Sequence, residues 1–402
     1  MRKLINRELL SVMAVIGLSV MAMAVLQPVL PLYLTSIRVN PTTLGLMFSV
    51  AMAGMVLGES TGGWIADKAG LKIPLAIGTF LCAPVVFAFT LTQNTSAIFL
   101  IFLFWGIFRA AIFGPTRGYI GINVPFASKA TFMGIYGATL AIARSLGALM
   151  SGFIADNLGY DWNFYISTGI SVIAGLLVLG GLQKIPLVKL RPPLPSPPTS
   201  GSPLPKPSYR YWPFIIQCVV AALAFLGSGV ISFLPLLATQ VVGVQATQVG
   251  ILFTIGNLAG AALLIPLGRL ADRRGKRVLM IIGLMVSAIG LAGCASASNF
   301  GWLTGYFIIN SIGQAMFSPA AVALLSDTVP FEWQNTAMGV YGACEDVGAI
   351  AGSALGGVVW TAWEPPATFI LGAISFGLGA LICFSLIREK SPGVRLPSCL
   401  PR

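Results

Sequence analysis

Two charged decapeptides that lie 205 positions apart constrain the architecture of this chain more than any other feature. Residues 63–72 read GWIADKAGLK, and residues 268–277 read GRLADRRGKR. Glycine, aspartate and glycine hold the same places in both copies, so that Asp67 corresponds to Asp272 and Gly70 to Gly275. Because the rest of the chain is almost free of charge, we interpret the two segments as corresponding loops of a duplicated unit.

The same offset recurs elsewhere in the chain. The tripeptide VPF at 124–126 returns at 329–331, and MGIYGA at 133–138 returns as MGVYGA at 338–343. With one residue of slippage, FGP at 113–115 matches FSP at 317–319. The sequence therefore predicts two similar halves in the same orientation.

The apolar content predicts a membrane protein. The chain of 402 residues is 56% hydrophobic and 9% charged, with a mean hydropathy of +0.88, whereas soluble domains carry about 25% charged residues. A helix that spans a bilayer needs roughly 20 apolar residues. Runs of that kind predict an all-α fold of twelve transmembrane helices at 9–35, 43–65, 73–92, 97–120, 130–155, 162–183, 212–239, 246–268, 278–297, 300–325, 335–361 and 366–387.

A proline-rich interruption divides these helices into two sets of six. Between 184 and 210 the chain carries a dense series of prolines, which predicts a stiff, extended linker rather than a membrane helix. We expect an N-terminal half at 1–183, a linker at 184–210, a C-terminal half at 211–388 and a tail at 389–402.

The positions of the basic residues predict the orientation. With twelve spans both ends lie on one side, and 21 of the 24 lysines and arginines fall on that side. The positive-inside rule then places both termini and the linker in the cytoplasm of a plasma or inner membrane. The net charge of +12 has the same origin and does not indicate nucleic-acid binding.

Several site classes are not expected in this sequence. The chain has no histidine, which excludes imidazole metal sites and histidine-based triads. Six isolated cysteines form no CxxC pair, so neither a zinc site nor a disulfide framework is predicted. We find no nucleophile–base pair or phosphate-binding loop, and we expect no enzyme activity and no cofactor.

The decapeptides resemble the signature of the major facilitator superfamily, Gly-x-Leu-Ala-Asp-Arg-x-Gly-Arg-Lys between helices 2 and 3, and the resemblance covers essentially the whole chain. It implies secondary transport by two six-helix halves around a central cavity. It also implies a cytoplasmic latch, formed by Gly63, Asp67, Gly70, Lys72, Gly268, Asp272, Arg273, Gly275, Lys276 and Arg277. Because Leu71 stands where the second copy has Lys276, we expect the stronger charge network in the second half.

The MG[I/V]YG stretches resemble the twelve-helix drug:proton antiporter branch of this superfamily. In that branch helix 5 carries a pattern like Gly-Pro-x-x-Gly-Gly, but here the aligned segment is 143–148, with Arg144 in the place of the proline. The resemblance implies proton-coupled efflux of a hydrophobic or amphipathic compound, and we expect a monomer; the departure at Arg144 leaves a second function open. Proton-coupled uptake of an anionic metabolite, with Arg109 and Arg144 as the clamp, is the alternative.

Five ionisable residues fall inside predicted helices, where a charge is costly and marks a functional hypothesis. They are Glu59, Arg109, Arg144, Glu345 and Asp346. One interpretation is a proton and substrate site in which one of the adjacent pair at 345–346 faces the cavity. The other interpretations are ion pairs that lock helices together and, for Glu59, a place in the gate or latch.

Uncharged polar residues are expected to complete a substrate site. In the superfamily helices 1, 4, 7 and 10 line the cavity, and these helices carry Gln27, Ser228, Asn310 and Gln314. Interhelical hydrogen bonds are the competing explanation for each of them. Glycines are spaced by four residues at 54, 58 and 62, at 256 and 260, and at 348, 352 and 356. In the superfamily helices 2 and 11, and 5 and 8, cross between the halves as gates, so this spacing favours gates there, with ordinary tight packing as the alternative.

Overall fold

The computed structural model describes residues 7–113, 115–116, 129–181, 211–329 and 333–386. Within these ranges the chain is helical and forms no strand. The first half contains α1 (Arg7–Leu26), α2 (Leu30–Ser36), α3 (Pro41–Ala69), α4 (Lys72–Ala88), α5 (Thr95–Ala110), α7 (Lys129–Leu158) and α8 (Tyr160–Gly181). The predicted linker at 184–210 and the tail at 389–402 lie outside the described residues.

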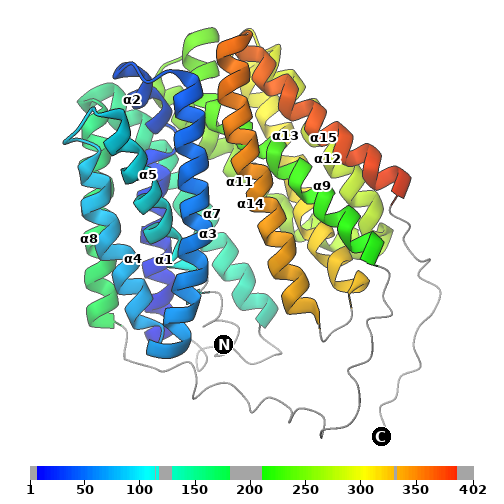
Figure 1. The fold of residues 1–402 in the computed structure, drawn as a ribbon, viewed down its shortest axis with the longest axis horizontal. Coiled ribbons are helices and arrows are strands. Elements are labelled where there is room, and N and C mark those ends of the chain that lie inside the picture. Colours follow the sequence, from blue (N-terminus) through cyan, green and yellow to red (C-terminus); the bar gives the residue numbers. More distant parts are fainter. Residues whose placement is uncertain (1–6, 114, 117–128, 182–210, 330–332, 387–402) are drawn as a thin grey trace, which may run out of the picture.

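The second half repeats this order. It contains α9 (Tyr211–Gly229), the short turns η3 (Val230–Phe233), α10 (Leu234–Leu236) and η4 (Leu237–Val241), and then five long helices. These are α11 (Ala246–Arg274), α12 (Lys276–Ala295), α13 (Phe300–Thr328), α14 (Gln334–Ala362) and α15 (Pro365–Leu386). In Figure 1 the two halves stand side by side and converge at the end away from the start of α1 and the end of α15. We call that end the distal side and the other the terminal side.

The helices account for the twelve predicted spans. In the described part of the chain, nine are long and apolar enough to cross a membrane, and α4 and α5 are shorter apolar helices. The remaining span is α14, which carries Glu345 and Asp346 within its 29 residues. The fold is thus an integral, multi-pass helical bundle.

Asparagine caps fix the start of corresponding helices in the two halves. Asn94 accepts from the amide of Ser96 at 2.9 Å where α5 begins. Asn299, 205 positions later, accepts from the amide of Trp302 at 3.0 Å where α13 begins. Each side chain satisfies an amide that has no partner within its own helix, which matters most in a bilayer.

The first span of each half is not the continuous helix that we expected. α1 stops at Leu26 and α2 begins at Leu30, with Pro28 in the turn between them. In the second half the helix passes through η3 and the π-helical turn η4 on either side of Pro235. Proline lacks the amide hydrogen that a helix requires, so the backbone changes its hydrogen-bond register there. These irregular segments place Gln27 and Ser232 in the wall of the central cavity.

The decapeptides are also less loop-like than expected. α3 continues through Ala69 and α11 through Arg274, so that only Gly70 and Leu71 separate α3 from α4 and Gly275 alone separates α11 from α12. Gly70 and Gly275 adopt φ angles of 83° and 97°, which side chains with a Cβ rarely tolerate. This is why glycine holds the same place in both copies. The side chains of Asp67, Asp272 and Arg273 lie outside the described set, and so does the burial of Gly268.

The described part of the predicted latch contains one contact that repeats and one that does not. Lys72 donates to the carbonyl of Leu179 at 2.7 Å, and Arg277 donates to the carbonyl of Phe384 at 2.5 Å, 205 positions later. Lys276 forms an ion pair with Asp327 at 2.5 Å. Its counterpart is Leu71, which is buried. Among the described contacts, the ion pair therefore belongs to the second half alone.

The glycine series do not form the contact between the halves that we expected. Gly58 faces α5 within its own half, because a Cβ there would overlap the carbonyl oxygen of Ile107. Gly352 faces α9 in the same way, against Leu226. Close packing at these two glycines thus joins helices of the same half, as it does between many membrane helices.

We predict that Gly58→Ala lowers the stability of the protein by about 1–3 kcal/mol, because the added methyl group forces α3 away from α5. Gly169→Ala is the matched control, since a Cβ at Gly169 meets open space. Alanine there should leave stability unchanged or raise it by about 0.5–1 kcal/mol. Unfolding of the purified variants in detergent would measure both, and equal effects would contradict the packing assignment.

We predict that Lys276→Leu, which copies the first half, costs less than about 1 kcal/mol, because Asp327 is largely exposed and its charge is screened. Asp327→Asn should cost a similar amount. If the pair acts as one unit, the double variant should lose no more than either single variant in the same unfolding assay. Additive losses would show that the two side chains stabilise the terminal side independently.

Candidate transport cavity

A cavity of about 600 Å³ lies between the two halves. Its walls come from α1, α2, α3, α5 and α7 of the first half and from α9 to α11 and α13 of the second half. Because both halves contribute, the site exists only when they are docked against each other. A volume of this size suits a drug-sized molecule, for which pockets of about 300–1,000 Å³ are usual.

Contacts between the halves gather at the distal side. There α3 packs against α14, and Ser49 donates to the carbonyl of Ile350 at 2.8 Å. On the other flank α7 packs against α11, and Thr254 donates to the carbonyl of Ser145 at 3.0 Å. We call these crossings the α3–α14 gate and the α7–α11 gate. Both are closed in this structure.

The four predicted cavity residues all line this space. Ser228 of α9 donates to Gln314 of α13 at 3.4 Å, and Gln314 donates to Asn310 at 3.0 Å. Asn310 in turn donates to the carbonyl of Ser287 on α12 at 3.2 Å. Gln27 lies across the cavity, in the turn between α1 and α2. The interhelical hydrogen bonds weighed as the competing explanation are thus present for the three residues of the second half.

Arg109 lies on the α5 wall of the cavity. Its guanidinium stacks on Trp105, with the Cζ atom 4.5 Å from the ring centroid, and Nη2 donates to the sulfur of Met55. Its Nε is buried without a hydrogen-bond partner. A buried guanidinium N–H without an acceptor is unfavourable. Because Arg109 lines the cavity, its positive charge favours an anionic partner there.

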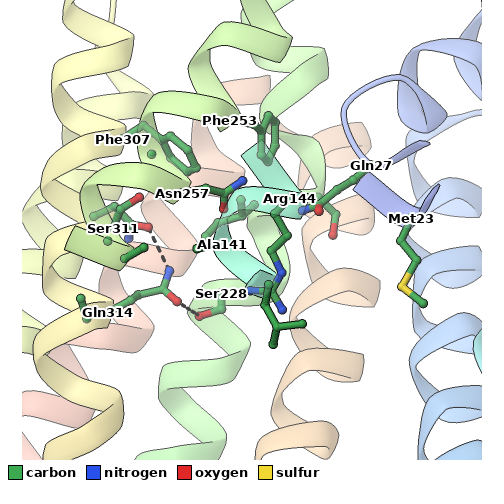
Figure 2. Close-up of a pocket in the computed structure, with 18 of the residues that line it drawn as sticks. Met23, Gln27, Ala141, Arg144, Ser228, Phe253, Asn257, Phe307, Ser311 and Gln314 are labelled. Atoms are coloured by element: carbon green, nitrogen blue, oxygen red, sulfur yellow. Dashed lines mark hydrogen bonds between the residues drawn. The ribbon is translucent and has the colours of Figure 1, made fainter. Parts of the chain in front are cut away.

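Arg144 projects from α7 into the open volume of the cavity. Figure 2 shows its side chain between Gln27 on one side and Ser228 and Gln314 on the other, with Asn257 above. Its exposed side chain faces the cavity, and it lies within electrostatic range of Arg109. Two guanidinium groups therefore give this cavity a positive field. Among the described residues that line it, none is Asp or Glu.

One predicted carboxylate, Glu59, lies within electrostatic range of Arg109, but the acids are not part of the described cavity wall. Neither Glu345 nor Asp346 lines the cavity in this conformation, and Glu59 is also absent from its described wall. Glu59 of α3 lies within electrostatic range of Asp346 of α14. The three acids belong to the α3–α14 side, while the cavity reaches toward α7 and α11.

The internal repeat explains this separation. Counterparts of the three acids at an offset of 205 are apolar and line the cavity, namely Leu264 for Glu59, Leu140 for Glu345 and Ala141 for Asp346. The two flanks of the molecule thus use equivalent positions differently. The α7–α11 flank forms a substrate-sized wall, whereas the α3–α14 flank carries acidic groups.

Several cavity residues were missed by the sequence reasoning. Asn257, Phe253 and Gly256 come from α11, the eighth span, which was assigned to a gate rather than to the cavity. An isolated asparagine within an apolar span was the signal available. Ser311, one residue after Asn310, was also missed.

Comparisons with known proteins agree with this architecture. The family model of the Major Facilitator Superfamily matches residues 12–241 and 216–398. An uncharacterized MFS-type transporter of Methanocaldococcus jannaschii is 21% identical over 329 residues, covering 81% of this chain and 84% of that protein. Multidrug resistance protein 2 of Bacillus subtilis is 22% identical over 369 residues, covering 90% and 91%.

A POT family peptide transporter has the same fold, with a TM-score of 0.75 at 12% identity over 97% of this chain and 99% of that one. The family match spans nearly the whole chain and both halves, and the relatives are transporters rather than enzymes. This chain belongs to the Major Facilitator Superfamily.

Proposed function

We propose that this protein is a secondary active transporter that carries an amphipathic organic anion by alternating access, in the direction of proton-coupled efflux. The observation that carries the proposal is the cavity itself, which presents two arginines and no acid among its described lining residues. Small molecules are its substrates, since it belongs to a family of membrane transporters.

The arginines favour a negative substrate group. A cationic side chain in a membrane protein is expensive and is retained where it pairs with a partner or a substrate. Arg109 carries a buried N–H without an acceptor, and Arg144 stands in the open volume nearby. A carboxylate, sulfonate or phosphate placed between them would accept charge-assisted hydrogen bonds from both, in the planar geometry that guanidinium groups favour.

The rest of the wall favours an apolar body on the same substrate. Phe48, Trp105, Phe253 and Phe307 line the cavity, so a hydrophobic or aromatic group can pack there. Gln314 and Ser228 supply neutral donors and acceptors on the opposite side. The combination suits a molecule with one acidic end and one apolar end.

The positions of the basic residues support an orientation in which both termini face the cytoplasm. Under that orientation the distal side faces outward, and both gates are closed toward the exterior. The structure then represents an inward-facing state of a monomer. Opening of the two gates, with closure of the terminal side, would complete the cycle.

Proton coupling is assigned to Glu59, Glu345 and Asp346 on the α3–α14 flank. Carboxylates within a membrane are the usual proton carriers of pumps and transporters, and the chain has no histidine to take that role. Glu59 and Asp346 lie within electrostatic range of each other across the two halves. Their mutual repulsion changes when the halves move.

The direction of transport rests on the relatives. Multidrug resistance protein 2 covers nearly the whole chain, which supports efflux. The alternative is uptake of an anionic metabolite, and the positive cavity favours it equally. Transport measured separately in inverted and right-side-out vesicles distinguishes the two.

We predict that Arg144→Gln and Arg109→Gln each weaken binding of an anionic probe by about 10- to 100-fold, the value of one charge-assisted hydrogen bond. Matched probes are aryl carboxylates and aryl sulfonates, each paired with its neutral amide. Thermal stabilisation of the purified protein by each probe measures affinity without a transport assay. Ser232→Ala, on the same cavity wall, is the control and should leave the preference for anions intact.

Stronger stabilisation by the neutral amides than by the acids would contradict the anion assignment. The assignment would also be contradicted if Arg109→Gln and Arg144→Gln both still bound the acidic probes more tightly than the neutral amides. Lysine at either position should recover part of the affinity, because it restores the charge but not the planar pair of donors.

We predict that Asp346→Asn, Glu345→Gln or Glu59→Gln uncouples transport from the proton gradient while substrate exchange continues. The reason is that these side chains carry the proton but do not line the cavity. Proteoliposomes with and without an imposed pH gradient would measure accumulation, and counterflow would measure exchange. Glu364→Gln, at an exposed distal position, is the control. Full gradient-driven accumulation in all three variants would exclude this flank as the proton site.

A further inference from the structure

The two distal gates are copies of each other at the level of single residues. A Cβ on Gly152 would overlap the carbonyl of Ala246, and a Cβ on Gly357, 205 positions later, would overlap the carbonyl of Pro41. Ala246 and Pro41 are themselves 205 positions apart. Both gates therefore close by the same approach of a glycine on one helix to the first residue of the other.

The next contact along each gate repeats as well. Thr254 donates to the carbonyl of Ser145 in the α7–α11 gate. At the same offset, Ser49 donates to the carbonyl of Ile350 in the α3–α14 gate. In each gate a hydroxyl thus donates to a backbone carbonyl of the other half, so the two gates are closed by equivalent contacts at this level.

The two gates differ at their distal ends. In the α7–α11 gate Asp156 of the first half accepts from two amides of the second half, Ala246 at 3.2 Å and Thr247 at 2.7 Å. The counterpart of Asp156 is Thr361, whose hydroxyl contacts the hydroxyl of Thr42 at 2.9 Å. The Thr42 hydroxyl also lies 3.3 Å from the carbonyl oxygen of Gly357. The distal contact of the α7–α11 gate therefore carries a charge, whereas that of the α3–α14 gate is neutral.

Asp156 occupies the place of an N-cap for α11, although it belongs to another helix. The first amides of any helix lack partners within it, and the helix dipole favours negative charge there. α3 supplies its own cap, since Asn40 accepts from the amide of Thr43 at 2.7 Å. The two amides of α11 are instead satisfied across the boundary between the halves, and separation of the halves breaks both bonds.

We propose that Asp156 is a positioning residue of the transport cycle, which holds the distal side closed by capping α11 from the opposite half. The α7–α11 gate is then the stronger of the two, and its release limits distal opening. In the open state the first amides of α11 must form hydrogen bonds with water instead. This inference rests on the alternating-access cycle proposed above but not on the identity of the substrate or of the coupling ion.

A reporter cysteine in the opposite gate tests the proposal. Ser49→Cys replaces a buried side chain of the α3–α14 gate and reacts with a maleimide only when the halves separate there. Because it lies in the other gate, local fraying of α11 leaves it protected. Labelling rates are measured on purified full-length protein in nanodiscs without substrate or gradient, and the chain without the reporter gives the background from the native cysteines.

Asp156→Ala should raise the labelling rate about fivefold, the effect of losing a typical N-cap. Asp156→Asn, which keeps one acceptor oxygen but loses the charge, should fall between the parent and the alanine variant. Thr361→Val, the matched change in the neutral gate, should raise the rate by less than about twofold, since the lost hydrogen bond is neutral and exposed. A thermal unfolding curve for each variant verifies that the fold is intact.

Parental labelling rates in both folded Asp156 variants would overturn the proposal. A Thr361→Val effect as large as that of Asp156→Ala would also overturn it, because the gates would then be equal. Since the assay contains neither probe anion nor proton gradient, a failure of the anion or proton assignments leaves its outcome unchanged.

Discussion

The bilayer is the constraint on which the rest of this structure depends. In hydrocarbon every backbone amide must form its hydrogen bond within the protein. A charged side chain there is energetically costly and is retained where it pairs with a partner or serves a function. The chain meets the first demand with long apolar helices that begin at asparagine caps such as Asn94 and Asn299. It meets the second by confining its embedded charges to a few positions, so that the location of each charge carries functional information.

Duplication gives this helical scaffold two equivalent flanks, and divergence has given them different tasks. At equivalent positions one flank places Leu264 and Ala141 in the cavity wall, while the other carries Glu59 and Asp346. These acids are therefore absent from the described cavity wall, although Glu59 lies within electrostatic range of Arg109. Each half is packed internally through glycines such as Gly58 and Gly352.

Sequence patterns predicted the secondary structure and the repeat because these depend on local physics. Apolar length defined the spans, and the offset of 205 related the halves. They were less informative where a local signal had two meanings. The spacing of the glycines predicted gates between the halves, but these glycines pack within each half. The charged decapeptides were predicted to be loops, but they are largely helical, with a glycine at each turn. Hydropathy also did not predict that the first span of each half would be interrupted near Pro28 and Pro235.

What the sequence determined by itself is the fold class, the duplication, the family and the residue types available for chemistry, because hydropathy, spacing and composition are properties of the chain. Tertiary structure decided which of those residues share a site. Arg109 and Arg144 meet at one cavity, Glu345 and Asp346 lie outside its wall, and Asp156 caps a helix 90 positions away. Such distances depend on how two rigid halves dock, and no local pattern encodes that geometry.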